Sequence, residues 1–592
     1  MKQPIDKENE QFKRTSTRGV FDETKKEKLQ LKQKEGKLHI PNQTRSQFLM
    51  AHTQRNLNTD HINFKVYHIL TKPWTFINAY SNISPKKSSL TLEKNSEEIT
   101  TGLFSVESAI AIAQEFKNKT YKHKPLRQTW ISKPGKKKRQ PIDTAIQKDC
   151  IVQEAVRGIL EAIYEPEFKE FEKLNNYTCT NYGFRPQKSC FDAVNNYKST
   201  SRECKTIIEG DIIEAYNNVN HNKLIKILSH RIRDKKFLKV IRNLLEAGII
   251  ENDGRITNNL NGTPQGGILS PLLFNIYMFE FDKHIYNRYI KHTRVEDTRN
   301  IEVKQEQYKK IKYLYKSLKT NSFELAKIPR DSNAKTLSTK DPYENCSTYI
   351  RYADDWIFAT RKNKRECKQI KAEITQYLKD ELFMELDPTK TLITVVNEGI
   401  SFLGWSIYKQ SYNKRTTSGP SKIAIEPDIN RILNKLTTLR YCRKDGFPIA
   451  QVYLLDLPEY YIVQKFNEIL RGLANYYSNC DRPSKLNRTH YILTYSCLKT
   501  IARRKKISLR QVIKNYGKSA KFTTILKYCN LKTGTSETKT KTIQLMSYEK
   551  FIEIIKSKKR SVFNTHVVSW KQQRKQDDPF KVLKGSTKKL LK

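Results

Sequence analysis

Apolar residues recur with two different spacings between residues 150 and 410. Spacings of three and four residues predict amphipathic helices over 151–163 and 370–382, and short apolar runs predict buried strands at 206–208, 349–350 and 356–358. Because helical and strand patterns alternate, we expect a mixed α/β region over residues 66–415. The two helical faces consist of Ile151, Val152, Ala155, Val156, Ile159, Leu160 and Ile163, and of Ile370, Ile374, Tyr377, Leu378 and Leu382.

Beyond the linker-like pair Gly419-Pro420 the pattern becomes mostly helical. Three apolar faces predict a helical domain over residues 421–517, and a run of four basic residues follows the third face directly. We interpret this run as a candidate RNA-binding surface. The faces are Ile429, Ile432, Leu433 and Leu436; Val463, Phe466, Leu470 and Leu473; and Tyr491, Tyr495, Leu498 and Ala502; the basic run is Arg503, Arg504, Lys505 and Lys506.

Three segments lack such periodicity. Residues 1–65 are polar and basic, which predicts a disordered arm, and residues 518–592 resemble a loosely patterned basic tail. Residues 283–345 form a charged insertion, in which Tyr308, Ile311, Tyr315 and Leu318 share one helical face. A solvated surface helix is the preferred interpretation of this face, and an RNA contact is the alternative.

The net charge of the chain indicates which kind of molecule it binds. The 592 residues include 110 basic and 61 acidic side chains, so the formal charge is +49. Such a surplus suits a protein that binds a polyanion, because each neutralised phosphate releases counterions. An AT-rich genome could explain why Lys outnumbers Arg, but it does not explain the shortage of acids. We therefore expect a nucleic-acid partner, with RNA favoured.

Cysteine spacing and hydropathy exclude other classes. The ten cysteines are scattered, and no two have the spacing of a zinc knuckle or a redox pair. No apolar run reaches membrane-spanning length, and the first residues have neither a signal-peptide core nor the acid-poor character of a transit peptide. We expect a soluble protein in a reducing compartment, without a membrane partner.

Tyr352-Ala353-Asp354-Asp355 is the strongest chemical signal in the chain. The two acids lie between apolar, β-prone flanks, which predicts a hairpin with both carboxylates at its tip. Carboxylate oxygens bind hard divalent cations, and two such ions can clamp the oxygens of a phosphoryl transfer. The alternative is a solvated acidic turn.

Two upstream segments could complete such a site. Asp211 ends the predicted strand 206–210, and it could supply a third carboxylate or merely cap a turn. Tyr216 could form a floor under a sugar, or could belong to the core. Residues 262–271 contain three glycines and two prolines around Gln265, a composition that suits a loop whose backbone approaches a ligand.

In this order, Asp211, the Pro264-Gln265-Gly266-Gly267 loop and Tyr352-Ala353-Asp354-Asp355 resemble the palm of a reverse transcriptase. More specifically, the chain resembles the reverse transcriptase/maturase proteins encoded by group II introns, over residues 70–517. Further motifs that carry this resemblance are Ile151-Val152-Gln153-Glu154-Ala155, Tyr164-Glu165-Pro166, Asn181-Tyr182-Gly183-Phe184-Arg185-Pro186, Glu385-Leu386-Asp387-Pro388-Thr389-Lys390-Thr391, Phe402-Leu403-Gly404-Trp405, Leu473-Ala474-Asn475-Tyr476-Tyr477, Lys499-Thr500-Ile501-Ala502-Arg503 and Asn515-Tyr516-Gly517.

The resemblance implies a right-hand polymerase of the α/β (α+β) class, with fingers over 66–200 and a palm over 201–415, followed by a mostly helical thumb/maturase domain over 421–517. It also implies that two Mg²⁺ ions are bound by Asp211, Asp354 and Asp355. The implied nucleotide contacts are Lys133, Arg139, Tyr216, Gln265 and Lys390, with Leu403 and Gly404 supporting the primer end. For Lys133 and Arg139 the alternative is a basic loop that contacts phosphates without specificity, since Lys136, Lys137 and Lys138 lie between them.

Some positions depart from the family pattern. The usual Arg-Pro-Leu-Gly-Ile-Pro stretch is replaced by Arg139-Gln140-Pro141-Ile142-Asp143, and Ile213 and Asn217 stand where the family usually has Lys and Asp. These departures concern rate and fidelity and leave the three acids intact. After residue 517 there is one cysteine and one histidine, so a nuclease of the His-Asn-His type with paired cysteines is not expected.

The resulting hypothesis is an RNA-directed DNA polymerase and group II intron maturase. It would bind its intron RNA, assist splicing and copy the RNA into DNA, using a DNA target, a primer and dNTPs. The alternative is a splicing-only RNA-binding maturase with a vestigial polymerase site. The AT-biased composition and the missing nuclease favour an organelle-encoded protein, plastid ahead of mitochondrion, with a bacterial cytoplasm as a further alternative. The sequence gives no oligomeric state.

Overall fold

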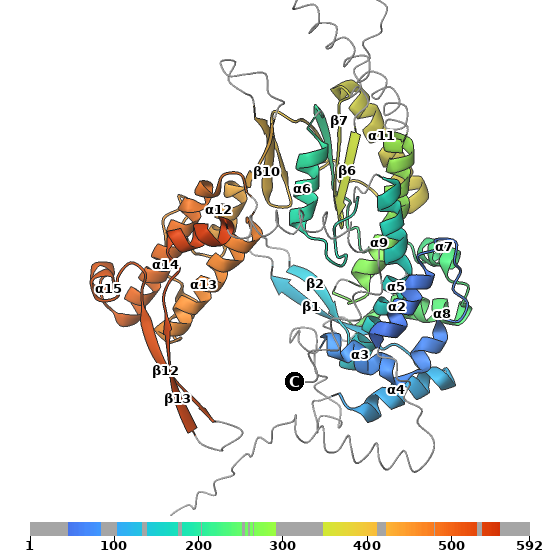
Figure 1. Cartoon of the computed structure of the whole chain (residues 1–592), viewed down its shortest axis with the longest axis horizontal. Coiled ribbons are helices and arrows are strands. Elements are labelled where there is room, and N and C mark those ends of the chain that lie inside the picture. Colours follow the sequence, from blue (N-terminus) through green and yellow to red (C-terminus); the bar gives the residue numbers. More distant parts are fainter. Residues whose placement is uncertain are drawn as a thin grey trace, which may run out of the picture.

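The structure is a computed structural model that describes residues 45–83, 104–132, 139–175, 180–202, 204–250, 255–257, 261–264, 266–291, 347–410, 422–478, 480–529 and 536–556. Figure 1 shows the arrangement of the helices and strands. Within these ranges, their buried apolar side chains form two large hydrophobic cores. None of the described helices combines the length and the apolar character needed to cross a bilayer.

A four-stranded antiparallel sheet lies between the two cores. Its strand order is β6 (Ser347–Tyr352), β7 (Asp355–Thr360), β3 (Thr206–Gly210) and β8 (Leu392–Val395). Successive side chains of a strand point to opposite faces. Accordingly, Ile208 and Phe358 belong to the first core, whereas Ile207 and Ile357 belong to the second. The sheet is therefore covered on both faces, as the apolar runs of these strands require.

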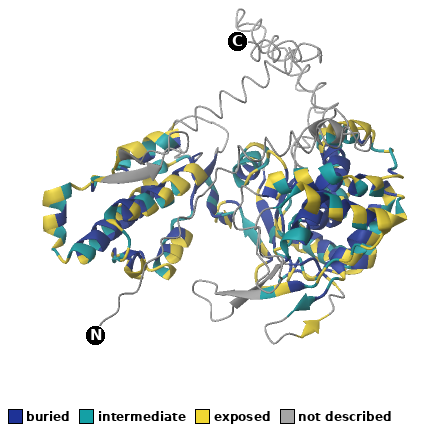
Figure 2. Cartoon of the chain, turned by 90° about the horizontal axis from the view of Figure 1, so that it is seen from below, coloured by how far each residue is buried: buried dark blue, intermediate teal, exposed yellow. Residues whose placement is uncertain are grey.

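The first core is built around the 28-residue helix α5 (Gln147–Leu174), most of which is buried. Figure 2 shows buried residues inside the described part of the chain and exposed residues on the outer sides of its helices. Smaller helices pack around it, and α9 and α11 join it to the sheet. A second sheet, of order β2-β1-β4-β5, lies beside this core. The elements are α2 (Arg45–Arg55), η1 (Tyr67–Thr71), α3 (Pro73–Ile83), α4 (Val106–Asn118), β1 (Leu126–Ser132), β2 (Arg139–Thr144), α7 (His221–Arg231), α8 (Lys235–Leu245), β4 (Ile249–Ile250), β5 (Ile256–Thr257), α9 (Ser270–Ile285), η4 (Tyr286–Ile290) and α11 (Lys364–Leu382).

We call the four-stranded sheet of order β6-β7-β3-β8 the palm sheet. Helix α6 (Cys190–Thr200) covers its other face, and the second core connects this helix to the C-terminal elements. A three-stranded sheet links the two parts, and α12–α15 with the β12–β13 hairpin extend away from it (Figure 1). These elements are β9 (Ile400–Phe402), β10 (Trp405–Gln410), β11 (Lys422–Pro427), α12 (Ile429–Thr438), η6 (Val452–Leu454), α13 (Glu459–Tyr476), η7 (Pro483–Leu486), α14 (Asn487–Lys505), α15 (Leu509–Tyr516), β12 (Phe522–Cys529) and β13 (Ser536–Ile543).

Two predicted boundaries are corrected by the structure. The N-terminal arm does not extend to residue 65, because α2 begins at Arg45 and buried Asn63 donates to the carbonyl of Arg231 at 3.1 Å. The basic tail does not begin at residue 518, because β12, β13 and a helix over 548–556 follow. Phe551 and Ile555 of that helix are buried in the second core. The sequence of β13 alternates Thr with Lys and contains no apolar face, so it does not predict a strand.

The predicted insertion over 283–345 begins inside ordered structure. Helix α9 continues through Ile285 into the π-helical turn η4, and Ile290 is buried in the first core. The helix predicted to carry Tyr308, Ile311, Tyr315 and Leu318 lies outside the described residues.

Candidate active site

The register of the palm sheet brings Asp211 beside Asp355. Gly210, the last residue of β3, pairs with Trp356 of β7, and the strands are antiparallel. Asp211 follows the end of β3, and Asp355 begins β7. Both residues therefore lie at the same end of the sheet. A Cβ at Gly210 would lie 2.1 Å from the Trp356 indole, so only glycine permits this close pairing. Tyr352 pairs with Asp355 across the hairpin, which leaves Ala353 and Asp354 as its two-residue turn.

The turn has an unusual backbone. Ala353 has φ +58°, in the left-handed region that non-glycine residues seldom occupy. A Cβ at Gly183 would lie 2.5 Å from the Ala353 backbone nitrogen, so Gly183 lets another loop pack directly against the turn. Asn275 of α9 holds that loop by donating to the Gly183 carbonyl at 2.7 Å. The strained turn is thus supported from beneath by two elements.

A buried ion pair also supports the turn. Arg351 donates to both oxygens of Asp282, at 2.8 and 2.6 Å, and to the Ala353 carbonyl at 3.1 Å. The side chains of Arg351 and Asp282 are 0% and 1% exposed. Burial alone would lower the pKa of Arg351, but the charge of Asp282 raises it above its usual value. The guanidinium therefore stays charged beneath the two acids.

The three acids and one lysine form the electrostatic centre of the site. Removal from water, followed by the charges of Asp354 and Asp211, raises the pKa of Asp355 to about 6, although part of this residue is exposed. Burial first, and Asp211 in addition, raises the pKa of Asp354. Lys390 forms an ion pair with Asp211, and its Nζ lies 3.4 Å from Asp387. The hydrogen bond to Asp211 raises the pKa of Lys390.

The donor set fits hard divalent cations. The carboxylates follow adjacent strand ends, and a bound cation would relieve the repulsion between them. Among the described residues, no group of three or more His, Cys, Asp or Glu side chains is arranged so that it could hold a metal ion. The side chains of the three acids would have to turn toward a common centre to bind one.

The glycine-rich loop lies next to these acids. The Thr263 backbone nitrogen donates to the Tyr216 carbonyl at 2.7 Å, and a Cβ at Gly262 would lie 2.5 Å from the Asn217 carbonyl oxygen. The Tyr216 ring stacks on Phe274 with centroids 4.6 Å apart. Burial, with the charge of Asp354 as a second cause, raises the pKa of the Tyr216 hydroxyl. Tyr216 is therefore a fixed, neutral wall beside the acids, whereas Gln265 lies outside the described residues.

Leu403 and Gly404 form the two-residue turn between β9 and β10, and both have positive φ values of 50° and 78°. Two tyrosines at the end of α13 hold this turn. The Tyr476 hydroxyl donates to the Leu403 carbonyl, and the Tyr477 hydroxyl donates to the Gly404 carbonyl at 3.1 Å. Trp405 packs edge-on against Tyr477. The predicted primer-support turn is therefore attached to the C-terminal helices.

The other predicted residues are dispersed. Lys133 lies outside the described residues, and Arg139 begins β2 opposite Ser132. The basic run at the end of α14 divides into two pairs. Arg503 and Lys506 are exposed, whereas Arg504 and Lys505 form ion pairs with Glu459 at the start of α13. Half of this predicted RNA-binding run therefore holds two helices together.

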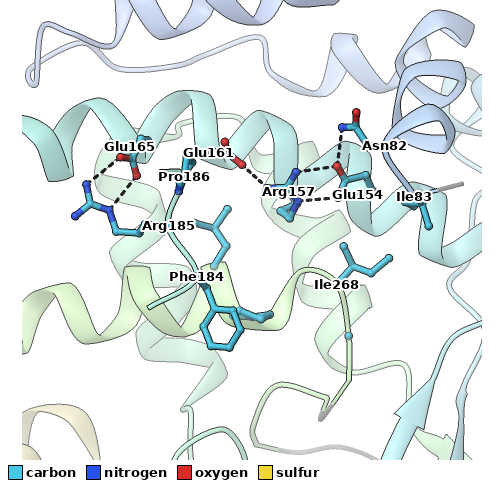
Figure 3. Close-up of a pocket in the computed structure, with 13 residues that line it drawn as sticks. Asn82, Ile83, Glu154, Arg157, Glu161, Glu165, Phe184, Arg185, Pro186 and Ile268 are labelled. Carbon is cyan, nitrogen blue, oxygen red and sulfur yellow. Dashed lines mark hydrogen bonds and ion pairs between the residues drawn. The ribbon is translucent and has the colours of Figure 1, made fainter. Parts of the chain in front are cut away.

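A cavity of about 520 Å³ adjoins the glycine-rich loop (Figure 3). On one wall, Arg157 bridges Glu154 and Glu161 of α5. Farther along the same helix, Glu165 accepts from Arg185 of the neighbouring loop through both of its oxygens, at 3.1 and 2.9 Å. These internal ion pairs occupy the charged groups of the walls. Pro186 and Ile268 bring the two loops to the same cavity, so it joins the Gly183 loop to the glycine-rich loop.

Sequence reasoning missed the residues that position the acids. Arg351 and Asp282 stand in apolar segments without any local sign that they pair, and the motif around Gly183 does not indicate a contact with Ala353. A charged residue in the middle of an otherwise apolar strand is the one available signal, because burial of a lone charge requires a partner.

Two family descriptions match the chain. "Reverse transcriptase (RNA-dependent DNA polymerase)" matches residues 131–407, and "Type II intron maturase" matches residues 421–583. The second range extends past residue 517, in agreement with the ordered hairpin and helix found there.

Individual proteins give the same result. Group II intron-encoded protein LtrA of Lactococcus lactis subsp. cremoris is 34% identical over 474 residues, which cover 77% of each chain. The putative COX1/OXI3 intron 2 protein of Saccharomyces cerevisiae is 27% identical over 78% of this chain and 54% of its own length. Among solved structures, apo telomerase from Candida tropicalis covers 48% of this chain and 53% of that chain, with 13% identity and a TM-score of 0.28, too low to support an argument. The chain belongs to the group II intron-encoded reverse transcriptase/maturase family, and it combines an RNA-directed DNA polymerase domain with an intron maturase domain.

Proposed function

We propose that Asp211, Asp354 and Asp355 are the catalytic acids of the polymerase and that they bind two Mg²⁺ ions. The observation that carries this proposal is the pairing of Gly210 with Trp356, which brings Asp211 beside Asp355. When bound, such ions lower the pKa of the primer 3′-hydroxyl and neutralise the leaving pyrophosphate. The raised pKa values of Asp354 and Asp355 support this role, because a cation would relieve the repulsion among the acids.

The surrounding residues would position the nucleotide and the primer. Tyr216 provides a rigid wall that would exclude a 2′-hydroxyl, and Lys390 would contact the triphosphate from beside Asp211. Gln265, Lys133 and Arg139 are assigned to the same nucleotide from their motifs. Leu403 and Gly404 would support the primer end, held by the tyrosines of α13.

The C-terminal elements from α12 onward would serve as thumb and maturase. Exposed cations such as Arg503 and Lys506 would contact phosphates of the intron RNA, which performs the splicing chemistry itself. The polymerase would then copy that RNA at a DNA target, using dNTPs. We further propose an organelle-encoded origin, plastid ahead of mitochondrion. An open reading frame inside a plastid intron would support this origin, and one in a bacterial genome would overturn it.

Primer extension on an RNA template with Mg²⁺ tests the site. We expect DNA synthesis by the wild type and none by Asp354→Ala, because one carboxylate of the metal site is removed. Asp380→Ala, an exposed acid on α11, is the matched control and should retain synthesis. Absence of synthesis by the wild type, together with tight intron binding and splicing, would instead establish a splicing-only maturase.

A further inference from the structure

A hollow of about 730 Å³ lies on the maturase part of the chain, away from the three acids. Its walls come from the segment 439–453, which follows α12, and from one face of α14. This volume is within the range of about 300–1,000 Å³ that is typical of ligand sites. We call it the 439–453 pocket.

The pocket presents apolar and aromatic side chains to solvent. Phe447, Val452 and Tyr453 are 50%, 58% and 65% exposed, and all three line it. Leu439 adds a further exposed apolar side chain. Several large apolar residues in one exposed patch indicate a binding surface, whereas single exposed apolar residues do not. The two rings offer flat faces on which another planar group can stack.

Cations surround these rings. The Lys499 ammonium lies 3.6 Å from the centroid of the Phe447 ring, and the Arg443 guanidinium lies 5.4 Å from it. Arg440 and Arg503 line the same hollow, and no described lining residue is acidic. In the described part of the chain, Arg440, Arg443 and Arg503 make no ion pair. Their charges therefore remain available to an anionic ligand.

The pocket is built in advance of any ligand. Side chains of α14 anchor its floor: Ser496 donates to the Ile449 carbonyl at 2.6 Å, Lys499 donates to the Pro448 carbonyl at 2.8 Å, and Thr500 accepts from the Gln451 backbone nitrogen at 2.9 Å. A preformed site loses less entropy when it binds.

The position of Arg440 also follows from the way α12 ends. It stands just after the helix with φ +60°, a left-handed conformation that Lys119, Phe383 and Lys506 also adopt at the ends of their helices. The chain reverses at this residue, and the arginine therefore lies at the rim of the pocket.

We propose that the 439–453 pocket binds one unpaired nucleotide of the intron RNA, with its base stacked on Phe447 or Tyr453 and its phosphate contacted by the arginines. Single-stranded RNA is recognised by this combination of stacking platforms and cations. A base inside a duplex cannot enter, because both of its faces are already stacked. The proposal rests on the RNA-binding role of the maturase domain and does not depend on polymerase activity.

Fluorescence anisotropy with the full-length protein tests the proposal. The probes are an oligoadenylate of about 12 nucleotides and a blunt RNA duplex of the same length. For Phe447→Leu we expect about tenfold weaker binding of the oligoadenylate, because stacking is lost, and unchanged binding of the duplex. Tyr491→Leu is the matched control, since Tyr491 is 49% exposed on α14 but does not line the pocket.

Tyr453→Leu is a second variant, which can be tested if Phe447→Leu fails to fold. Thermal melting shows whether each variant is folded. Unchanged oligoadenylate binding by both variants, or equal losses for oligoadenylate and duplex, would overturn the proposal. Preference for an oligodeoxyadenylate would assign the pocket to DNA, and Phe447-dependent binding of an acidic peptide alone would assign it to a protein partner. Because these measurements do not involve DNA synthesis, an inactive polymerase would leave their outcome unaffected.

Discussion

Arg351 and Asp282 form a two-bonded ion pair that is buried directly beneath the turn carrying Asp354. Arg351 also donates to the Ala353 carbonyl, so the pair connects α9 to the turn that carries the proposed catalytic acids. The hydroxyl of Tyr349 adds a third bond to Asp282, at 2.9 Å. The position of the acids therefore depends on a charge network that solvent does not reach.

Without one partner of this ion pair, the protein should unfold at a lower concentration of denaturant. In Asp282→Asn, the guanidinium of Arg351 stays buried without its counter-charge, and such changes cost about 3–5 kcal/mol of unfolding free energy. Urea unfolding of the metal-free protein measures this loss. The double variant Asp282→Leu with Arg351→Met is the control and should recover much of the stability, because no lone charge remains. A loss below about 1 kcal/mol in Asp282→Asn would contradict a structural role for the pair.

Gly183→Ala should impair DNA synthesis more than stability. The added Cβ would lie 2.5 Å from the Ala353 nitrogen, and this backbone atom can move only with the turn that carries Asp354. A shift of about 1 Å in the acids can reduce kcat by about 100-fold. Single-turnover primer extension measures this effect. Gly472→Ala in α13 is the matched control: nothing lies within 4 Å of the new Cβ, so activity should persist and stability should rise by up to about 1 kcal/mol. Equal activity of both variants would contradict the proposed packing.

The acids were predictable from sequence, whereas their support was not. Asp211 and Asp355 each adjoin a short apolar run, and a strand end is a local feature that the sequence displays. The partner of Arg351 lies 69 residues earlier in the chain, and no local pattern reveals such a pairing. The contact of Gly183 with Ala353 is equally remote. Site geometry depends on these long-range contacts, so sequence reasoning found the chemical groups but not what holds them.

The C-terminal part shows the same limit. The three predicted helices correspond to α12, α13 and α14, because helical periodicity is local. The third predicted face is only partly buried, since Tyr491 is 49% exposed. The β12–β13 hairpin was missed, since β13 alternates Thr with Lys and reads as a solvated stretch. The basic run at the end of α14 stays a predicted RNA-binding surface, and the sequence does not show that Arg504 and Lys505 form ion pairs with Glu459.

Asp355→Asn should stabilise the metal-free protein near neutral pH. The pKa of Asp355 is raised from 3.8 to about 6, so its ionised form opposes folding above pH 6. Because the pKa is higher in the folded protein, the wild type gains stability as the pH falls from about 6, where folded Asp355 takes up a proton. This gain is complete below pH 3.8, where the unfolded chain is protonated as well. The variant should therefore exceed the wild type in Tm at pH 7.5 and match it near pH 4. Adding Mg²⁺ should raise the Tm of the wild type more than that of the variant. A difference that does not vary with pH would contradict this account.

Tyr476→Phe should weaken the use of the primer. The lost hydroxyl donates to the Leu403 carbonyl, so the β9–β10 turn would lose one of its two attachments to α13. We expect KM for primer–template to rise about three- to tenfold, the cost of about one hydrogen bond, with a smaller change in kcat. Steady-state primer extension separates the two constants. Tyr461→Phe, an exposed tyrosine on the same helix, is the matched control and should leave both unchanged. A loss confined to kcat would place Tyr476 in the chemistry of the acids, and equal effects of the two variants would show that the turn does not depend on this bond.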